Sequence, residues 1–144
     1  MHCTTQYPTN FSDVNLNAVK TLQETFKCQI GYSDHTIGNE VSIAALGSGC
    51  SYFEKHFTID KNLEGPDHKA SLSVPELKNY VRILKKVNLA LGSREKKATN
   101  IEILNKKIVR RSIVANGIIK KGDIFTSQNV ICKRPEIGLS LIHI

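Results

Sequence analysis

Two histidines follow apolar stretches of the sequence at matching positions. His35 ends the run Ile30–His35, His56 lies near the end of Cys50–Phe57, and both runs are predicted to be short strands. Reactive groups gather at the carboxyl ends of parallel strands, so the two imidazoles could converge on one divalent metal ion. Two imidazoles alone would leave coordination positions open for a substrate oxygen. Mn²⁺, Mg²⁺ and Zn²⁺ are each chemically compatible with this pair.

A carboxylate accompanies the second histidine. Glu54 lies two residues before His56, and the alternation of side chains along a strand puts both on one side. Lys55 then faces the other way and is interpreted as a charge beside the helix layer. Glu54 could act as an acid–base group, bind a substrate hydroxyl, or orient a histidine through a hydrogen bond. Asp67, in a later loop, could bind sugar hydroxyls or simply form a turn.

The segments that must position these residues alternate between strands and helices. Helices are predicted over 16–26 and 37–46, and a capping-box spacing at Ser73 opens a third helix that Gly92 closes. Three strands, each followed by a helix, predict a parallel sheet. Three units are too few to close a barrel, and no glycine-rich phosphate loop marks a doubly wound sheet. Residues 1–92 are therefore interpreted as the last portion of something larger.

The pattern changes after this region. Residues 93–107 are polar and charged and predict a linker with at most one helical turn, at 101–104. Strand-like runs follow at 110–115 and 130–135, with turn residues between them. Short strands and turns predict a small β module.

Composition excludes several classes of protein. The 144 residues are 40% hydrophobic and 23% charged, as in an ordinary folded protein, and they contain no apolar run long enough to span a membrane. The N-terminus shows no signal-peptide pattern, so we expect a cytoplasmic protein with reduced cysteines. The cysteines form no C-x-x-C pair, which argues against a zinc ribbon.

The net charge of +7 is confined to the C-terminal part of the chain. Residues 93–144 hold 11 of the 20 basic residues but only four of the 13 acidic ones. A basic segment favours an anionic partner, so a non-catalytic nucleic-acid-binding module is an alternative from another functional class. Such a module needs clustered basic residues interleaved with aromatics, and Phe125 is the only aromatic residue in this segment. We therefore expect no nucleic-acid partner.

Six ordered motifs, spread over roughly residues 1–138, resemble those of the sialic acid synthase family. They are His2–Pro8, Gly31–Thr36, Glu54–Thr58, Gly65–Ser71, Arg110–Ala115 and Lys133–Pro135. The resemblance implies an α/β fold, the C-terminal part of a (β/α)8 TIM barrel followed by a truncated antifreeze-like (SAF) β domain. Residues 1–92 would form the last three β/α units, 93–107 the linker, and 108–138 the partial antifreeze-like domain.

The family condenses phosphoenolpyruvate with an N-acetylated amino sugar and releases phosphate. The resemblance therefore implies a synthase that makes N-acetylneuraminate from N-acetylmannosamine and uses a divalent metal, usually Mn²⁺. The alternative product is N,N'-diacetyllegionaminate, made from 2,4-diacetamido-2,4,6-trideoxymannose. The family also forms domain-swapped homodimers.

Matching positions imply roles for individual residues. His35 and His56 resemble the metal ligands, and we assign catalytic roles to Glu54 and His56. Thr5 and Ser33 resemble contacts to phosphoenolpyruvate. Thr5 stands where the family commonly has Ser or Asn, and its hydroxyl keeps the contact plausible.

Other matching positions concern the sugar and the second subunit. Tyr7, Glu54 and Asp67 resemble contacts to the amino sugar. Arg134 resembles an arginine that the antifreeze-like domain of one subunit inserts into the barrel of the other. The resemblance therefore gives the basic segment a functional role through one residue.

The two ends of the sequence depart from the family. Its first five barrel strands, with lysines that hold phosphoenolpyruvate, have no counterpart in these residues, so we expect this chain alone to be inactive and poorly folded. Residues 139–144 read as the translation of a common transposon-type sequencing-adapter end. Our hypothesis is that they are an assembly artefact, which the DNA sequence at that point would test.

Overall fold

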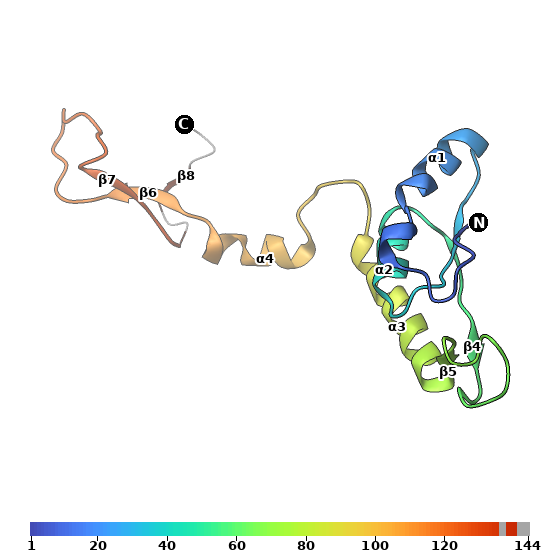
Figure 1. Ribbon diagram of the computed structural model, residues 1–144. Coiled ribbons are helices and arrows are strands. Elements are labelled where there is room, and N and C mark those ends of the chain that lie inside the picture. Colours follow the sequence, from blue (N-terminus) through green and yellow to red (C-terminus); the bar gives the residue numbers. More distant parts are fainter. Residues whose placement is uncertain (136–137, 141–144) are drawn as a thin grey trace. The chain divides into compact units, whose positions relative to one another are not determined.

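The computed structural model describes residues 1–135 and 138–140, shown as a ribbon in Figure 1. The chain divides into two compact units, Met1–Ser93 and Arg94–Ile144. Among the described residues there is no helix both long and apolar enough to cross a bilayer.

A parallel sheet organises the first unit. Its strands are β1 (His2–Cys3), β2 (Gly31–Ser33) and β3 (Tyr52–Glu54), in that spatial order. Both pairings are parallel, with Cys3 opposite Ser33 and Ser33 opposite Glu54. The parallel arrangement predicted from the strand–helix alternation is thus confirmed for these three strands. The strands run in register, so their carboxyl ends meet at one edge.

Helices of the first unit pack through apolar residues. The helices of the first unit are α1 (Asn17–Phe26), α2 (Glu40–Gly47) and α3 (Val74–Leu91), with a short 3-10 turn at Phe11–Asp13. The buried core joins α1 and α2 to the strands and consists of Val14, Val19, Ile30, Tyr32, Val41, Ala45 and Cys50. The positions predicted for all three helices are confirmed to within a few residues.

The strand predicted over Cys50–Phe57 is interrupted. β3 ends at Glu54, two residues lie outside strands, and β4 (Phe57–Thr58) pairs in parallel with β5 (Leu72–Ser73). β5 was not predicted, because two residues carry no alternation signal. Its last residue, Ser73, is the N-cap of α3 and forms the predicted capping box with Glu76. This capping box fixes the point where the loop carrying Asp67 returns to the helix layer.

The described residues of the second unit form one helix and a small antiparallel sheet. The helix is α4 (Asn100–Val109), and the strands are β6 (Ser112–Ala115), β7 (Val130–Lys133) and β8 (Leu139–Ser140), in the order β7-β6-β8. Residues 141–144 lie outside the described part. Of the segment 139–144, which we interpret as an assembly artefact, the structure therefore describes only the two residues of β8.

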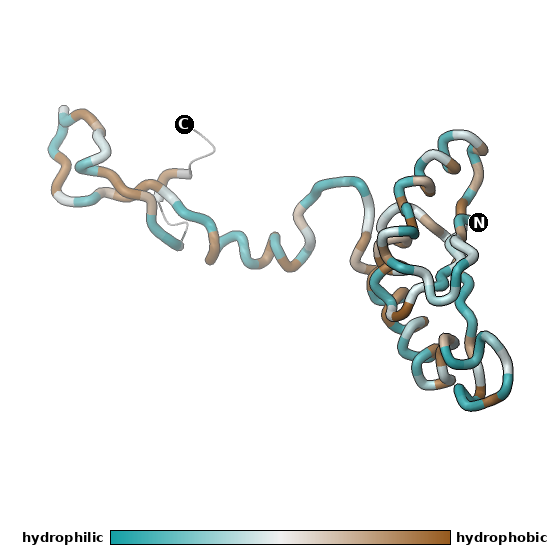
Figure 2. Tube along the Cα trace, in the orientation of Figure 1, coloured by the Kyte–Doolittle hydropathy of each residue, from teal (hydrophilic) through white to brown (hydrophobic). Residues whose placement is uncertain are grey.

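Helix α4 corrects the expectation of a linker with at most one helical turn. Thr99 caps the helix, accepting a hydrogen bond from the Glu102 backbone at 3.2 Å, while the Glu102 side chain accepts one from the Thr99 backbone at 2.6 Å. This reciprocal cap satisfies two backbone donors and starts the helix. Apolar residues also recur along α4, as the brown segments of Figure 2 show. The many charged residues around it obscured both signals in the sequence.

Candidate metal and substrate site

Three side chains meet at the carboxyl edge of the parallel sheet. His35, Glu54 and His56 each offer one ligand atom, and these atoms all lie within 4.8 Å of one another. The structure therefore brings together the two predicted histidines and adds Glu54 to them. The imidazole rings have centroids 5.4 Å apart and are tilted by 59°.

The backbone fixes where these side chains begin. The Asp34 N–H donates to the Glu54 carbonyl at 2.8 Å, which extends the β2–β3 pairing by one residue. The His35 carbonyl accepts a hydrogen bond from the Thr9 N–H at 2.9 Å. The segment after β1 is thereby tied to the end of β2, and Tyr7 belongs to that segment.

Ser33 lies between two members of the triad. Its hydroxyl donates to Glu54 Oε1 at 3.2 Å, and its Oγ is 3.3 Å from Nε2 of His35. Ser33 is itself buried, so these contacts hold its hydroxyl in one place. The predicted phosphoenolpyruvate contact therefore lies directly beside the candidate metal ligands.

Tyr7 covers both histidines. Its ring centroid is 4.3 Å from that of His35 and 4.6 Å from that of His56. Burial is the main cause that raises the pKa of Tyr7 to about 12, and the carboxylates of Asp67, Asp34 and Glu54 act in the same direction. The phenol therefore keeps its proton at neutral pH and can donate a hydrogen bond.

Asp67 approaches the site from the loop before β5. Its Oδ2 lies 3.7 Å from Nδ1 of His56, and it is more than half exposed. A cavity of about 370 Å³ opens here, lined by residues that include His56, Asp67 and His68. His68 is held by Thr58, whose Oγ1 is 2.8 Å from its Nδ1. The carboxylate of Asp67 is thus accessible beside the second histidine.

Two other predicted site residues are exposed. Thr5 is exposed, and no hydrogen bond of its side chain is found in the described part of the chain. Arg134 is exposed just after β7, in the second unit. The structure accordingly groups Tyr7, Ser33 and Asp67 with the triad and leaves the roles of Thr5 and Arg134 as predictions.

The donor set of the triad fits a divalent cation. Two imidazoles and a carboxylate suit Zn²⁺ and Mn²⁺ alike, since both metals accept nitrogen and oxygen ligands. Ligands bound at about 2.1 Å on opposite sides of one ion would lie up to about 4.2 Å apart. The ligand atoms of the triad lie within 4.8 Å of one another, which is close to this limit.

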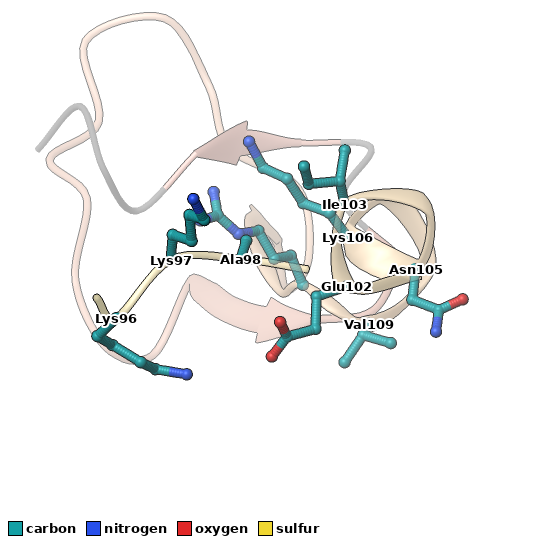
Figure 3. Close-up of a pocket in the computed structure, with 9 residues that line it drawn as sticks. Lys96, Lys97, Ala98, Glu102, Ile103, Asn105, Lys106 and Val109 are labelled. Atoms are coloured by element: carbon teal, nitrogen blue, oxygen red, sulfur yellow. The ribbon is translucent and has the colours of Figure 1, made fainter. Parts of the chain in front are cut away.

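A larger pocket lies elsewhere, in the second unit. It lies along α4 and has a volume of about 630 Å³. Figure 3 shows residues that line it, among them Lys96, Lys97, Lys106, Ile103 and Val109. Its lining contains no histidine or cysteine, so it offers no comparable set of metal ligands.

The first unit matches a known protein family. Residues 1–96, which include every member of the triad, match the NeuB family. The chain belongs to the NeuB family.

Two relatives of this NeuB-family chain are named as sugar-acid synthases. It is 49% identical over 143 residues to N,N'-diacetyllegionaminic acid synthase of Campylobacter jejuni, covering 99% of this chain and 43% of the relative. It is 37% identical over 134 residues to human N-acetylneuraminate-9-phosphate synthase, covering 92% of this chain and 37% of the relative. The chain therefore spans about two fifths of the length of these curated relatives.

A solved structure of the same kind resembles the NeuB-family chain in fold. The N-acetylneuraminic acid synthetase of Leptospira borgpetersenii, crystallised with citrate, is 35% identical with a TM-score of 0.64. The match covers 72% of this chain and 36% of the solved one. This likeness supports a mixed α/β fold shared with these synthases.

Sequence reasoning missed some neighbours of the site in this NeuB-family chain. The Sγ of Cys3 lies 3.8 Å from Nε2 of His35, although the thiol is not part of the triad. Asp34 and Lys55 lie behind the histidines and form a buried ion pair at 3.0 Å. The interpretation of Lys55 as a charge facing the helix layer is confirmed. The sequence held one signal for its partner Asp34. Asp34 precedes His35 as Lys55 precedes His56, and alternation along the strands turns both of these side chains away from the site.

Proposed function

We propose that this chain is part of a synthase that joins phosphoenolpyruvate to an N-acetylated amino sugar and releases phosphate. The observation that carries the proposal is the cluster of His35, Glu54 and His56, with the Tyr7 phenol and the Ser33 hydroxyl against it. Such a cluster can hold a metal ion and two oxygen-rich substrates together. The names of the two relatives described above, both sugar-acid synthases, support the same reaction class.

In the proposed reaction, the alkene carbon of phosphoenolpyruvate forms a bond to the aldehyde carbon of the open-chain sugar. Water then adds to the former enol carbon, and that carbon loses phosphate by cleavage of its C–O bond. The product is a nine-carbon 2-keto acid, with one molecule of phosphate released. No oxidant or reductant is needed, because the electron pair of the alkene forms the new C–C bond.

The residues of this chain would position and polarise the reactants. His35, Glu54 and His56 would hold a divalent ion, for which we propose Mn²⁺, and the bound ion would draw electron density from the aldehyde oxygen. Ser33 would donate to phosphoenolpyruvate. Tyr7 would donate to an oxygen of the sugar, because its phenol stays protonated.

The remaining proposed contacts lie at the edges of the site. Asp67 would accept hydrogen bonds from sugar hydroxyls, since its exposed carboxylate stands beside His56. Thr5, the second residue after β1, would contact phosphoenolpyruvate once that substrate is bound. Glu54 would also accept either a proton or a hydrogen bond from the reacting sugar.

We also propose how the chain is divided into domains. Residues 1–92 would be the last three units of a (β/α)8 barrel, and residues 108–138 would begin an antifreeze-like domain. In a domain-swapped dimer, Arg134 would enter the site of the other subunit. Co-expression of Arg134→Ala with His35→Ala tests this: mixed dimers should recover activity, because one of their two sites is intact, whereas no recovery would remove Arg134 from the proposal.

Our first choice of acceptor is N-acetylmannosamine, and the alternative is 2,4-diacetamido-2,4,6-trideoxymannose. The protein expressed from its full reading frame should be incubated with Mn²⁺, phosphoenolpyruvate and each sugar in turn. Phosphate release and the mass of the product report turnover. We expect a sugar acid with one acceptor and none with His35→Ala. Absence of product with both acceptors and with related N-acetylated sugars would overturn the proposed function.

A further inference from the structure

A buried ion pair lies directly behind the candidate metal site. The Nζ of Lys55 is 3.0 Å from Oδ2 of Asp34, and the two side chains are 4% and 0% exposed. Asp34 immediately precedes His35, and Lys55 immediately precedes His56. His35 and His56 therefore face the site. Asp34 and Lys55 face the opposite side, where they contact each other.

Every oxygen of the Asp34 carboxylate is engaged. Its Oδ1 accepts from the backbone N–H of Thr36 at 2.9 Å and from the Thr36 hydroxyl at 2.7 Å. Its Oδ2 accepts from the Ser42 hydroxyl at 2.5 Å as well as from Lys55. These donors come from the turn after β2, from α2 and from the segment after β3. The carboxylate thus connects three parts of the first unit.

Lys55 is held equally closely. Its ammonium group also donates to the Thr36 carbonyl at 2.7 Å and lies 5.9 Å from the ring centroid of Tyr80 on α3. The Tyr80 hydroxyl in turn lies 2.8 Å from Oγ of Ser42. The network therefore spans from the sheet edge to two helices, and buried side-chain polar atoms without a partner are not found in the described residues.

Stability alone is a weak reason for such a network. Burying two charges costs desolvation energy that their attraction only partly returns, and replacing a buried pair with apolar residues is often neutral or stabilising. Groups that orient metal ligands, by contrast, commonly change metal affinity when they are altered. The position of this pair, one residue from each histidine, is what such an orienting role requires.

We propose that Asp34 and Lys55 are positioning residues that set the separation of His35 and His56 for metal binding. The inference rests on the proposed function, because it takes the triad as the metal site. The ion pair ties the two ligand-bearing segments together at a point beyond the last residues of β2 and β3. It adds a side-chain link to the backbone hydrogen bond between Asp34 and Glu54, which joins the same two segments.

The test is a titration of Mn²⁺ followed by electron paramagnetic resonance, using the protein from its full reading frame. The main variant is the double substitution Asp34→Asn with Lys55→Met, which removes both charges and leaves no unpaired one in the core. Lys55→Met alone is a second variant. Lys69→Met is the matched control, because Lys69 is exposed. Circular dichroism and thermal unfolding establish that each variant is folded.

We expect the folded double variant to bind Mn²⁺ about 10–100-fold more weakly, with an altered spectrum of the bound ion, and Lys69→Met to match the wild type. A purely structural pair would lower the unfolding temperature and leave Mn²⁺ affinity within about twofold, and that result would overturn the inference while leaving the proposed function intact. A wild-type protein that does not bind Mn²⁺ would overturn both.

Discussion

The ring of Tyr7 lies over the ring of His56, with centroids 4.6 Å apart and planes inclined by 24°. The same ring is 4.3 Å from the centroid of His35. One phenol therefore forms a wall against both candidate metal ligands and restricts their rotation. Burial raises the pKa of its phenol to about 12. Like an ordinary tyrosine, it is therefore a protonated donor at neutral pH.

Tyr7→Phe should separate these two roles. The phenylalanine keeps the wall and removes the donor, so Mn²⁺ affinity should stay unchanged while the sugar loses one hydrogen bond. A hydrogen bond contributes about 0.5–1.5 kcal/mol, so KM for the amino sugar should rise roughly 2–10-fold. Steady-state kinetics at saturating phosphoenolpyruvate measure this. A KM equal to that of the wild type would show that the hydroxyl does not contact the sugar.

Glu54→Gln tests the third member of the triad. The amide keeps the size of the side chain but loses its charge, which weakens an oxygen ligand to a divalent ion. We expect weaker Mn²⁺ binding and a fall in kcat of about 100-fold or more, because Glu54 is proposed both to hold the ion and to assist the sugar. Glu64→Gln, in the exposed loop, is the control. Unchanged Mn²⁺ binding in Glu54→Gln would restrict Glu54 to a substrate contact.

Alkaline pH should destabilise the first unit. Burial raises the pKa of both Tyr7 and Tyr80 from 10.0 to about 12, and it raises that of Tyr32 further. Between these pH values the folded chain retains protons that the unfolded chain releases, so the free energy of unfolding falls as pH rises. Below pH 10.0 the free energy of unfolding should not depend on these tyrosines. Phenolate absorbance, recorded together with circular dichroism, should rise in step with unfolding. Full ionisation near pH 10.0 in a folded protein would contradict this.

The N-cap of α3 should contribute measurably to stability. The Ser73 N–H and hydroxyl both donate to Oε2 of Glu76, at 2.6 and 2.8 Å, and Lys61 lies 2.6 Å from the same oxygen. Ser73→Ala should lower the free energy of unfolding by about 1 kcal/mol, the usual effect of losing such a cap. Urea unfolding measures it, with the exposed Ser93→Ala as control. Equal losses in the two variants would argue against the cap.

Sequence patterns located the histidine pair because the signal is local. Each imidazole follows an apolar run, and parallel strands bring such ends together. Helix α3 was equally clear, since its capping box and Gly92 mark both ends. The short strand β5 and the Asp34–Lys55 pair were not found, because both depend on contacts between residues distant in the chain. Helix α4 was missed for another reason, as its charged surroundings masked the Thr99–Glu102 cap.

Tyr7 was also predicted only in part, because some of its contacts are to residues distant in the chain. Its resemblance to a sugar contact was visible in the motif, whereas its packing against both imidazoles depends on how the segment after β1 crosses the edge of β2. That crossing is fixed by the hydrogen bond from the Thr9 N–H to the His35 carbonyl. A single backbone contact of this kind leaves no trace in composition or periodicity.

The central claim is that His35, Glu54 and His56 hold one divalent ion. Crystals of the protein from its full reading frame, grown with Mn²⁺, should be measured with X-rays on both sides of the manganese absorption edge. We predict one anomalous peak at about 2.1–2.3 Å from a ligand atom of each residue, lost in His35→Ala and retained in His68→Ala. A peak bound by other side chains, with the triad free of metal, would contradict the account.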